Sequence, residues 1–305
     1  MPRRVLSLFA LFVVLLPPAG ARAATDVFDR VADHYVDNDG VRVHYATLGH
    51  RGRLVVMIHG FPDVWYSWRD QMAALAPRYR VAALDQRGYN LSDKPAGVEQ
   101  YELSDLASDV AAVIRDQGET HAVIVGHDWG GAVAWAFAMQ YPEMTDGLVI
   151  LNLPHPRSLL RELRDNPAQR TASAYAYNLQ QPGAAATLRP EILAAWVTDP
   201  VARARYVEAF RRSDPEAMVS YYKANYPQPP YADTPLPEVH APVLMFHGLA
   251  DPFLLAGGTD GTWQWLTNTF TLVTIPGAGH FVQQDASREV SRRLLRWLAD
   301  QHLQR

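Results

Sequence analysis

The sequence predicts an α/β fold with a mostly parallel central sheet and an inserted helical segment. Short, continuously apolar runs alternate with helical patterns before residue 155 and return after residue 239, which is typical of parallel strands covered by helices on both faces. Between these limits only helical patterns occur. The length of 305 residues is long for one domain, but it fits a single large unit with an insertion.

The first 23 residues are typical of an export signal. Arg3 and Arg4 precede an apolar run at 5–16, and a small-residue site ends at Ala23. A membrane anchor is the alternative, but the run is too short to span a bilayer comfortably and a cleavage pattern follows it. We therefore expect residues 1–23 to be a signal peptide cleaved after Ala23. The mature protein is then periplasmic or secreted, without stable insertion in the membrane.

The composition excludes several classes of protein. Cleavage would remove three arginines and no acidic residue, so the formal net charge of -4 would become -7, and a nucleic-acid partner is not expected. Because the chain has no cysteine, a thiol nucleophile, a lipoprotein anchor and cysteine-based metal sites are excluded. An exported fold of this kind must be stabilised by its core rather than by disulfides.

The first expected element is an antiparallel hairpin, because Asp39-Gly40 separates two alternating runs. Strands buried on both faces follow as continuously apolar runs at residues 54–59, 80–85, 121–126 and 147–152. Further strands at residues 242–248 and 270–276 complete the sheet. Helical patterns cover residues 66–76, 104–117, 130–141 and 284–302, the last being a closing amphipathic helix. These elements assign residues 24–154 and 240–305 to the two parts of one core.

The insertion, residues 155–239, is predicted to form a helical lid. Asp199-Pro200 and Asp214-Pro215 are typical of helix caps with proline in the first turn. A proline-rich stretch at residues 226–242 then predicts an extended connector back to the core. We expect the functional cleft to lie between this lid and the core.

Asp128 is the candidate nucleophile. It stands at the centre of GHDWG, residues 126–130, directly after an expected strand and before a helix. Small residues two positions to either side allow a sharp, strained turn that presents the central side chain above the sheet. A simple helix cap is the alternative interpretation. No G-x-S-x-G occurs in the chain, so a serine esterase or lipase has no visible nucleophile.

An aspartate in this turn suits attack on a saturated carbon. The side chain is anionic at neutral pH and can attack such a carbon in line, which forms an ester on the protein. A serine would leave an ether, which water does not readily cleave, whereas water can attack the carbonyl of an ester. The turn therefore predicts alkyl transfer followed by ester hydrolysis.

Hydrolysis of an ester needs a base, and His280 lies just past the last expected strand. Asp251, in HGLADPF after another strand, is the candidate to orient His280 and stabilise its charged form; a turn carboxylate is its alternative interpretation. The chain order nucleophile, acid, histidine is the one that hydrolases with such a turn use. The backbone N–H groups of Phe61 and Trp129 are expected to form an oxyanion hole. We interpret the other ten histidines as ordinary packing or surface residues.

Five segments carry a resemblance to a known family. HGFPDVWYSWRDQ, DQRGYNLSDKP, GHDWGG, HGLADPF and GAGHF occur in this order around a helical insertion, and together they resemble the epoxide hydrolases of the α/β-hydrolase fold. The resemblance covers essentially all of the mature chain. It implies the same fold and hydrolysis of an epoxide to a vicinal diol, with water as the second substrate.

The resemblance also implies that two lid tyrosines hold the epoxide oxygen. The matching segments AYAYNLQQPG and MVSYYKANY give Tyr175 and Tyr222. Helical periodicity agrees with the assignment of Tyr222, because Tyr222 shares a helical face with Tyr226 whereas Tyr221 lies on another face. Packing is the alternative role for both side chains, and Tyr177 is the rival of Tyr175.

Two departures from the pattern bear on the site. Asn90 replaces a glycine that is common in related hydrolases, but asparagine tolerates the left-handed conformation. The secreted Cif-like group resembles this chain in architecture, yet it has its acid, a glutamate, where this sequence has Asn152, and it has a histidine in place of one lid tyrosine. We therefore favour Asp251 as the acid and keep the tyrosine pair.

The expected substrate is a small-molecule epoxide, with a hydrophobic or aromatic substituent. No metal or organic cofactor is implied, and the protein is expected to be a monomer or a homodimer. A haloalkane or haloacid dehalogenase with the same nucleophile is the alternative enzyme, and a non-catalytic lidded binding protein is the alternative from another class. The expected pocket residues are Phe61, Trp129, Tyr175, Tyr222 and Phe281.

Overall fold

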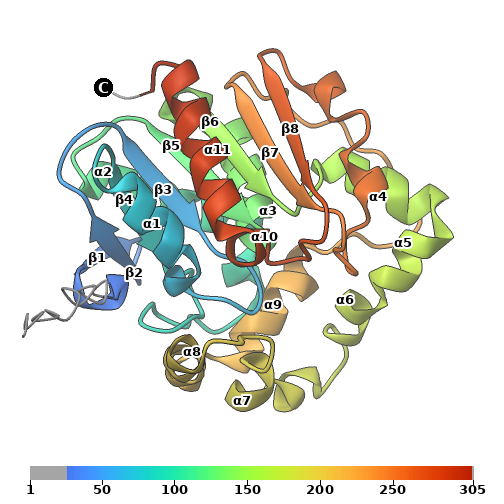
Figure 1. Cartoon of the computed structure of the whole chain (residues 1–305). Coiled ribbons are helices and arrows are strands. Elements are labelled where there is room, and N and C mark those ends of the chain that lie inside the picture. Colours follow the sequence, from blue (N-terminus) through green and yellow to red (C-terminus); the bar gives the residue numbers. More distant parts are fainter. Residues whose placement is uncertain (1–25, 304–305) are drawn as a thin grey trace, which may run out of the picture.

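The computed structural model describes residues 26–303, so the predicted signal peptide and its cleavage site lie outside the described residues. One sheet has the strand order β1-β2-β4-β3-β5-β6-β7-β8 (Figure 1). Strands β1 (Ala32–Asn38) and β2 (Val41–Leu48) form the predicted antiparallel hairpin. Strand β2 pairs antiparallel with β4, and the other pairs are parallel. The parallel strands are β3 (Leu54–Ile58), β4 (Arg80–Leu84), β5 (Ala122–His127), β6 (Thr145–Leu151), β7 (Val243–Gly248) and β8 (Phe270–Ile275).

The burial of the strands follows their place in the sheet. Every residue of β3, β5 and β7 is buried, because helices cover both faces of the parallel region. Strand β8 is different, because only Val273 in it is buried. It lies at the edge of the sheet with a single neighbour, β7, so its outer surface meets solvent. The α/β class predicted from the apolar runs is confirmed.

The core helices pack in pairs against the sheet. Helices α1 (Arg69–Leu75) and α11 (Ser287–Asp300) contact each other in front of the strands in the view of Figure 1, and α2 (Leu103–Asp116) contacts α3 (Trp129–Gln140). The closing helix differs from the prediction, since a short helix α10 (Val282–Asp285) precedes α11. Ala286, with φ -127° and ψ 38°, is not helical and separates the two.

Only helices are found between β6 and β7. Asp199 and Asp214 cap two of these helices, as predicted. Each side chain accepts a hydrogen bond from a backbone N–H of the first turn, and a proline directly follows each aspartate. Figure 1 shows the inserted helices gathered at one end of the sheet. No helix within residues 26–303 combines the length and apolar character that a bilayer span requires. The inserted helices are α4 (Pro156–Asp165), α5 (Pro167–Ala172), α6 (Ala174–Asn178), α7 (Pro190–Leu193), α8 (Pro200–Arg212) and α9 (Pro215–Asn225).

Candidate active site

Asp128 stands on a strained turn between β5 and α3. Its φ is +50°, a region that costs a non-glycine residue on the order of 1–3 kcal/mol. The turn closes only because its neighbours have no side chain. A Cβ on Gly126 would lie 2.2 Å from the Gly130 carbonyl oxygen, and a Cβ on Gly130 would lie 2.1 Å from that of Ile58. The two glycines that flank the turn thus explain how the chain presents a carboxylate at the end of β5.

The structure brings Asp128, His280 and Asp251 together at the carboxyl ends of three strands. His280 Nε2 lies 3.3 Å from Asp128 Oδ2, and His280 Nδ1 lies 2.8 Å from Asp251 Oδ2. All three side chains are buried. The histidine therefore sits between two carboxylates, with one ring nitrogen directed at each.

This arrangement sets the charges of the cluster. Burial lowers the pKa of His280, but the hydrogen bonds and negative charges of the two carboxylates outweigh it and raise the pKa to about 10. Burial likewise opposes ionisation of the acids, yet His280 lowers the pKa of Asp128 and takes that of Asp251 to about 2. At neutral pH the cluster holds two carboxylates and one imidazolium.

A backbone amide already contacts the candidate nucleophile. The N–H of Phe61 donates to Asp128 Oδ1 at 2.7 Å. Gly60 permits this approach, since a Cβ there would lie 2.6 Å from the same oxygen. Trp129 begins α3, where N–H groups have no acceptor within the helix. The Phe61 amide therefore contacts Asp128 directly, and the oxyanion hole formed with the Trp129 amide stays a prediction.

The predicted tyrosine pair faces Asp128 from the inserted helices. The rings of Tyr222, on α9, and Tyr175, on α6, are 6.1 Å apart and meet edge to face, and the Tyr222 ring lies 5.0 Å from that of Trp129. Burial raises the pKa of both phenols well above the usual value, and the negative charge of Asp128 adds to this effect. Both hydroxyls therefore stay protonated and can act as hydrogen-bond donors.

The neighbouring tyrosines are engaged elsewhere. Tyr221 points away from the site and donates to the Arg87 carbonyl oxygen at 2.8 Å, as its position on the helix predicted. Tyr177 shares a hydrogen bond of 2.6 Å with Tyr231 and donates to the Pro227 carbonyl oxygen. Of the two candidates on α6, only Tyr175 lines the cavity beside Asp128.

A cavity of about 380 Å³ lies next to Asp128, between the core and the inserted helices. Trp129, Tyr175 and Tyr222 line it, as expected. Phe61 and Phe281 do not, which corrects the prediction. Phe61 instead packs edge to face on Tyr222, and Phe281 stacks on Trp196 at 3.8 Å. Most of the lining comes from residues that sequence reasoning missed, namely Leu103, Ala132, Ala136, Met139, Leu153, Leu159, Leu160 and Leu254.

Asn152 is a further residue of the site whose role the sequence did not reveal. It follows β6 with φ +43° and is fully buried. Its side-chain amide donates to Asp251 Oδ2 at 2.6 Å and to the Gly279 carbonyl oxygen at 3.2 Å, and its Oδ1 accepts from the Gly248 N–H at 3.0 Å. One side chain therefore joins the loop of the acid to the loop of the histidine.

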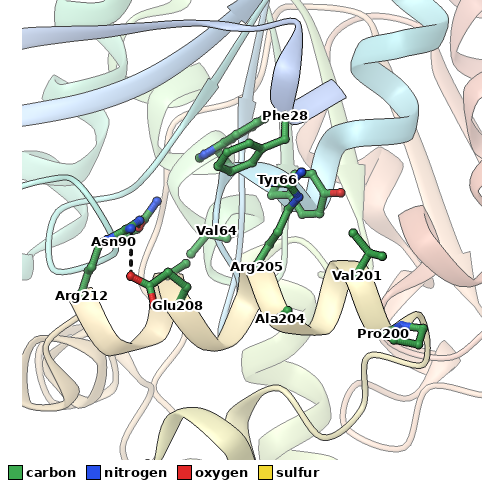
Figure 2. Close-up of a pocket in the computed structure, with 12 residues that line it drawn as sticks. Phe28, Val64, Tyr66, Asn90, Pro200, Val201, Ala204, Arg205, Glu208 and Arg212 are labelled. Carbon is green, nitrogen blue, oxygen red and sulfur yellow. Dashed lines mark hydrogen bonds and ion pairs between the residues drawn. The ribbon is translucent and has the colours of Figure 1, made fainter. Parts of the chain in front are cut away.

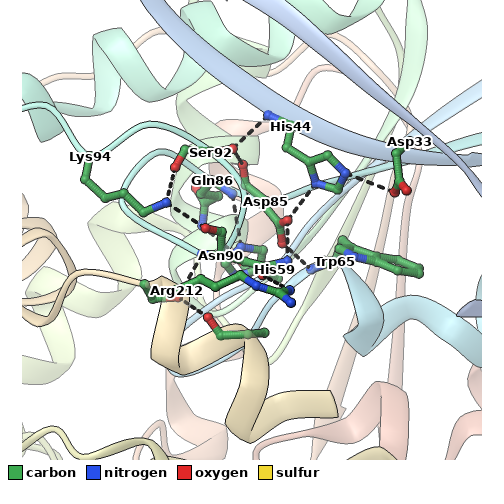
Figure 3. Close-up of polar contacts among 12 residues, drawn as sticks. Asp33, His44, His59, Trp65, Asp85, Gln86, Asn90, Ser92, Lys94 and Arg212 are labelled. Atoms are coloured by element: carbon green, nitrogen blue, oxygen red, sulfur yellow. Dashed lines mark hydrogen bonds and ion pairs between the residues drawn. The ribbon is translucent and has the colours of Figure 1, made fainter.

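A buried polar cluster surrounds Asp85, at the end of β4 (Figure 3). Asp85 accepts hydrogen bonds from His44 at 2.7 Å, Asn90 at 2.8 Å and the Trp65 N–H at 3.1 Å. Asn90 has φ +40°, so its side chain bonds Asp85 from the left-handed backbone that the sequence predicted. Because Trp65 follows Phe61 closely in the chain, this cluster fixes the loops after β3 and β4 to each other.

A second cavity, of about 550 Å³, lies beside α8 (Figure 2). None of its lining residues belongs to the cluster around Asp128. Its most prominent cation, Arg205, is paired with Asp26 at 3.0 Å and covers the Phe28 ring at 3.8 Å. This cavity has the larger volume, but the reactive groups lie beside the smaller one, which is therefore the candidate active site.

Comparison with known proteins shows the family to which the chain belongs. Residues 53–287 match the family model described as the alpha/beta hydrolase fold. The chain is 33% identical over 287 residues to Epoxide hydrolase 3 of Xenopus tropicalis, covering 87% of this chain and 77% of that protein. It is also 33% identical over 290 residues to the AB hydrolase superfamily protein YfhM of Bacillus subtilis, covering 90% and 100%.

A solved structure is similar over the same region. The crystal structure of a mutant epoxide hydrolase from Bacillus megaterium, complexed with its product (R)-3-[1]naphthyloxy-propane-1,2-diol, superposes with a TM-score of 0.81 at 31% identity, covering 87% of this chain and 100% of that one. The family model spans most of the chain, and several relatives above 30% identity are epoxide hydrolases. This chain therefore belongs to the epoxide hydrolases of the α/β-hydrolase fold.

Proposed function

We propose that this epoxide hydrolase opens its substrate by forming an ester on Asp128 and then hydrolyses that ester to release a vicinal diol. The observation that carries the proposal is the set of contacts on one buried carboxylate. Asp128 Oδ1 accepts from the Phe61 amide, and Asp128 Oδ2 faces His280 Nε2. The related Bacillus megaterium enzyme has a 1,2-diol as its product, which supports the same outcome here.

In the first step Asp128 attacks the less hindered ring carbon. A bond forms between a carboxylate oxygen and that carbon, and the ring C–O bond breaks with its electron pair passing to the epoxide oxygen. Tyr175 and Tyr222 donate hydrogen bonds to this oxygen as charge develops on it. The inserted helices that carry the two tyrosines act as the lid over the reaction.

Ester formation changes the protonation of His280. Once Asp128 is esterified, one of the two negative charges that raised the pKa of His280 is gone, and the pKa falls from about 10. His280 then gives up its proton as the alkoxide takes one up, so the step needs no net proton from solvent. The loss of charge on the nucleophile thus converts the histidine into a base.

In the second step neutral His280 removes a proton from water, whose oxygen adds to the carboxyl carbon of Asp128. The amides of Phe61 and Trp129 stabilise the resulting oxyanion. The ester C–O bond breaks, the diol leaves with the proton from His280, and Asp128 then ionises by protonating His280 again. Asp251 keeps the imidazole oriented throughout.

The test is to block the second step alone. A His280→Gln variant mixed with styrene oxide should carry one stoichiometric adduct on Asp128 by intact-mass and peptide analysis, because the ester forms and then persists. One turnover of the unmodified enzyme in heavy-oxygen water should give unlabelled diol and a labelled Asp128. If the variant folds but forms no adduct, and the first diol is labelled, the ester mechanism is wrong.

The alternatives receive less support. A haloalkane dehalogenase is expected to place a second halide donor opposite Trp129, where this chain has Phe61, and it has no need of the two tyrosines that face Asp128. Fluoroacetate enzymes would be expected to have an arginine in the place of Trp129. A non-catalytic binding protein is expected to have lost at least one reactive position, whereas Asp128, His280 and Asp251 are all present.

A further inference from the structure

The cavity beside Asp128 owes its shape to small residues on one face of α3. Ala132, Ala136 and Met139 recur at helical spacing after Trp129 and line the cavity. They are partly accessible, whereas Trp135 and Phe137 on the other faces of the same helix are fully buried. Alanines at these two positions leave a channel between α3 and the inserted helices, which larger side chains would fill.

The channel is long and leads away from Asp128. Its lining on α3 extends from Trp129 to Gln140, a distance of about 16 Å along a helix that rises about 1.5 Å per residue. Gln140, at the far end, is exposed. The opposite wall comes from α4 through Leu159 and Leu160. The cavity therefore has a mostly apolar lining that extends along α3 from the residue after the nucleophile to the exposed Gln140.

The other side of Asp128, towards His280, is filled with aromatic rings. Phe281 stacks on Trp196 with a ring separation of 3.8 Å and an angle of 2° between the planes, and it also contacts the His280 ring at 5.3 Å. Phe253 packs edge to face on His280 at 5.3 Å. A group that entered from this side would have to separate the stacked rings.

We propose that the preferred substrates are terminal epoxides that carry one long, unbranched apolar substituent, which lies along α3 from Trp129 to Gln140. This inference rests on the proposed function and specifies the substrate class of that site. The unsubstituted ring carbon faces Asp128, and the substituent occupies the channel. A trans-disubstituted epoxide would direct its second substituent at the Phe281 and Trp196 rings. Ala132 and Ala136 set the width of the channel and thereby act as specificity-determining residues.

The channel predicts how rate depends on chain length. Each methylene that leaves water for an apolar wall contributes about 0.8 kcal/mol, which corresponds to about a fourfold gain in kcat/KM. With a C–C bond of about 1.5 Å, an extended chain advances about 1.3 Å per carbon, so a channel of about 16 Å accommodates about twelve carbons. The gain should continue to that length and stop once added carbons pass Gln140 into solvent.

The experiment compares kcat/KM for 1,2-epoxyhexane, 1,2-epoxydecane, 1,2-epoxytetradecane and 1,2-epoxyhexadecane, and for trans-5,6-epoxydecane. We expect a rise of about fourfold per methylene in the terminal series as far as 1,2-epoxytetradecane and a rate for the trans isomer at least about 50-fold below that of 1,2-epoxydecane. Ala136→Phe should block the channel and abolish the gain for the longer substrates of the series. Ala204→Phe, on α8 beside the second cavity, is the matched control and should keep the full series.

The outcomes separate the two proposals. If no epoxide yields diol and His280→Gln forms no adduct, the ester mechanism is wrong. If all epoxides yield diol but rates do not depend on chain length, or the trans isomer reacts as fast as the terminal one, the substrate inference alone is overturned. Met139→Trp provides a second obstruction further from Asp128, and it should shorten the series rather than abolish it. A fold check by circular dichroism accompanies each variant, and the substrate series on the unmodified enzyme decides the matter even if both variants fail to fold.

Discussion

Replacing Asn152 tests how the acid loop and the histidine loop are held together. The Asn152 amide is one of four donors to the Asp251 carboxylate, the others being His280 Nδ1 and the N–H groups of Phe253 and Leu254. A hydrogen bond to a charged group contributes about 1.5–3 kcal/mol. Glycine and aspartate both tolerate the positive φ at this position, so Asn152→Gly removes the donor and Asn152→Asp replaces it while the backbone stays the same.

The two variants should respond differently to pH. If the whole free energy of this hydrogen bond is lost from the transition state of ester hydrolysis, Asn152→Gly slows that step by about 10- to 150-fold at every pH. In Asn152→Asp two carboxylates share one site, so one pKa rises strongly. At pH 5.5 the protonated Asp side chain can donate to Asp251 as the amide did, and the rate should approach that of the unmodified enzyme. At pH 8 the second charge repels Asp251 and the rate should fall to the level of the glycine variant or below.

Rapid-quench single turnovers with intact-mass detection measure the decay of the ester separately from its formation. The rate of each variant is expressed relative to the unmodified enzyme at the same pH, so that the titration of the other groups cancels. Equal losses in the two variants across the whole pH range would refute the reasoning, because they would mean that Asn152 acts only through packing. A loss confined to ester formation would refute it as well.

Two further predictions follow from groups with shifted pKa values. Tyr222→Phe and Tyr175→Phe should each slow ester formation by about 10- to 100-fold, the effect of removing one hydrogen bond to a developing charge, and leave ester decay unchanged; slower ester decay would contradict their assignment to the epoxide oxygen. Burial raises the pKa of Asp63 to about 7 despite its hydrogen bonds from Ser67 and the Val64 N–H. Because the unfolded chain loses this proton near pH 4, the folded state is destabilised progressively as pH rises from about 4 to about 7, by on the order of 4 kcal/mol in total. Asp63→Asn removes this cost, so urea unfolding should show a higher free energy of unfolding for the variant at pH 8 and no such gain at pH 4.5. A difference between variant and unmodified protein that does not depend on pH would show that the carboxyl stays ionised.

The sequence predicted the reactive side chains more completely than it predicted the residues that line the cavity around them. Asp128, His280 and Asp251 each follow an apolar run, and the carboxyl ends of parallel strands meet at one edge, so local patterns sufficed to bring them together. Tyr222 was implied by the resemblance to the epoxide hydrolases, and its helical spacing agreed with that assignment. The cavity could not be predicted in this way, because its walls depend on how the inserted helices pack on α3. Phe61 and Phe281 lie beside reactive residues in the chain, yet their rings pack on Tyr222 and Trp196.

The apolar channel and the charged cluster depend on each other. Asp128, His280 and Asp251 interact strongly because little water reaches them, and charges in a medium of low polarity couple far more strongly than in water. A substrate whose chain fills the channel expels further water from this region. The fall in the pKa of His280 on ester formation is then larger, because the lost charge of Asp128 was less screened. A long apolar substituent should therefore speed ester hydrolysis as well as binding, whereas a chain that served only to hold the substrate would change KM and leave the decay of the ester unaltered.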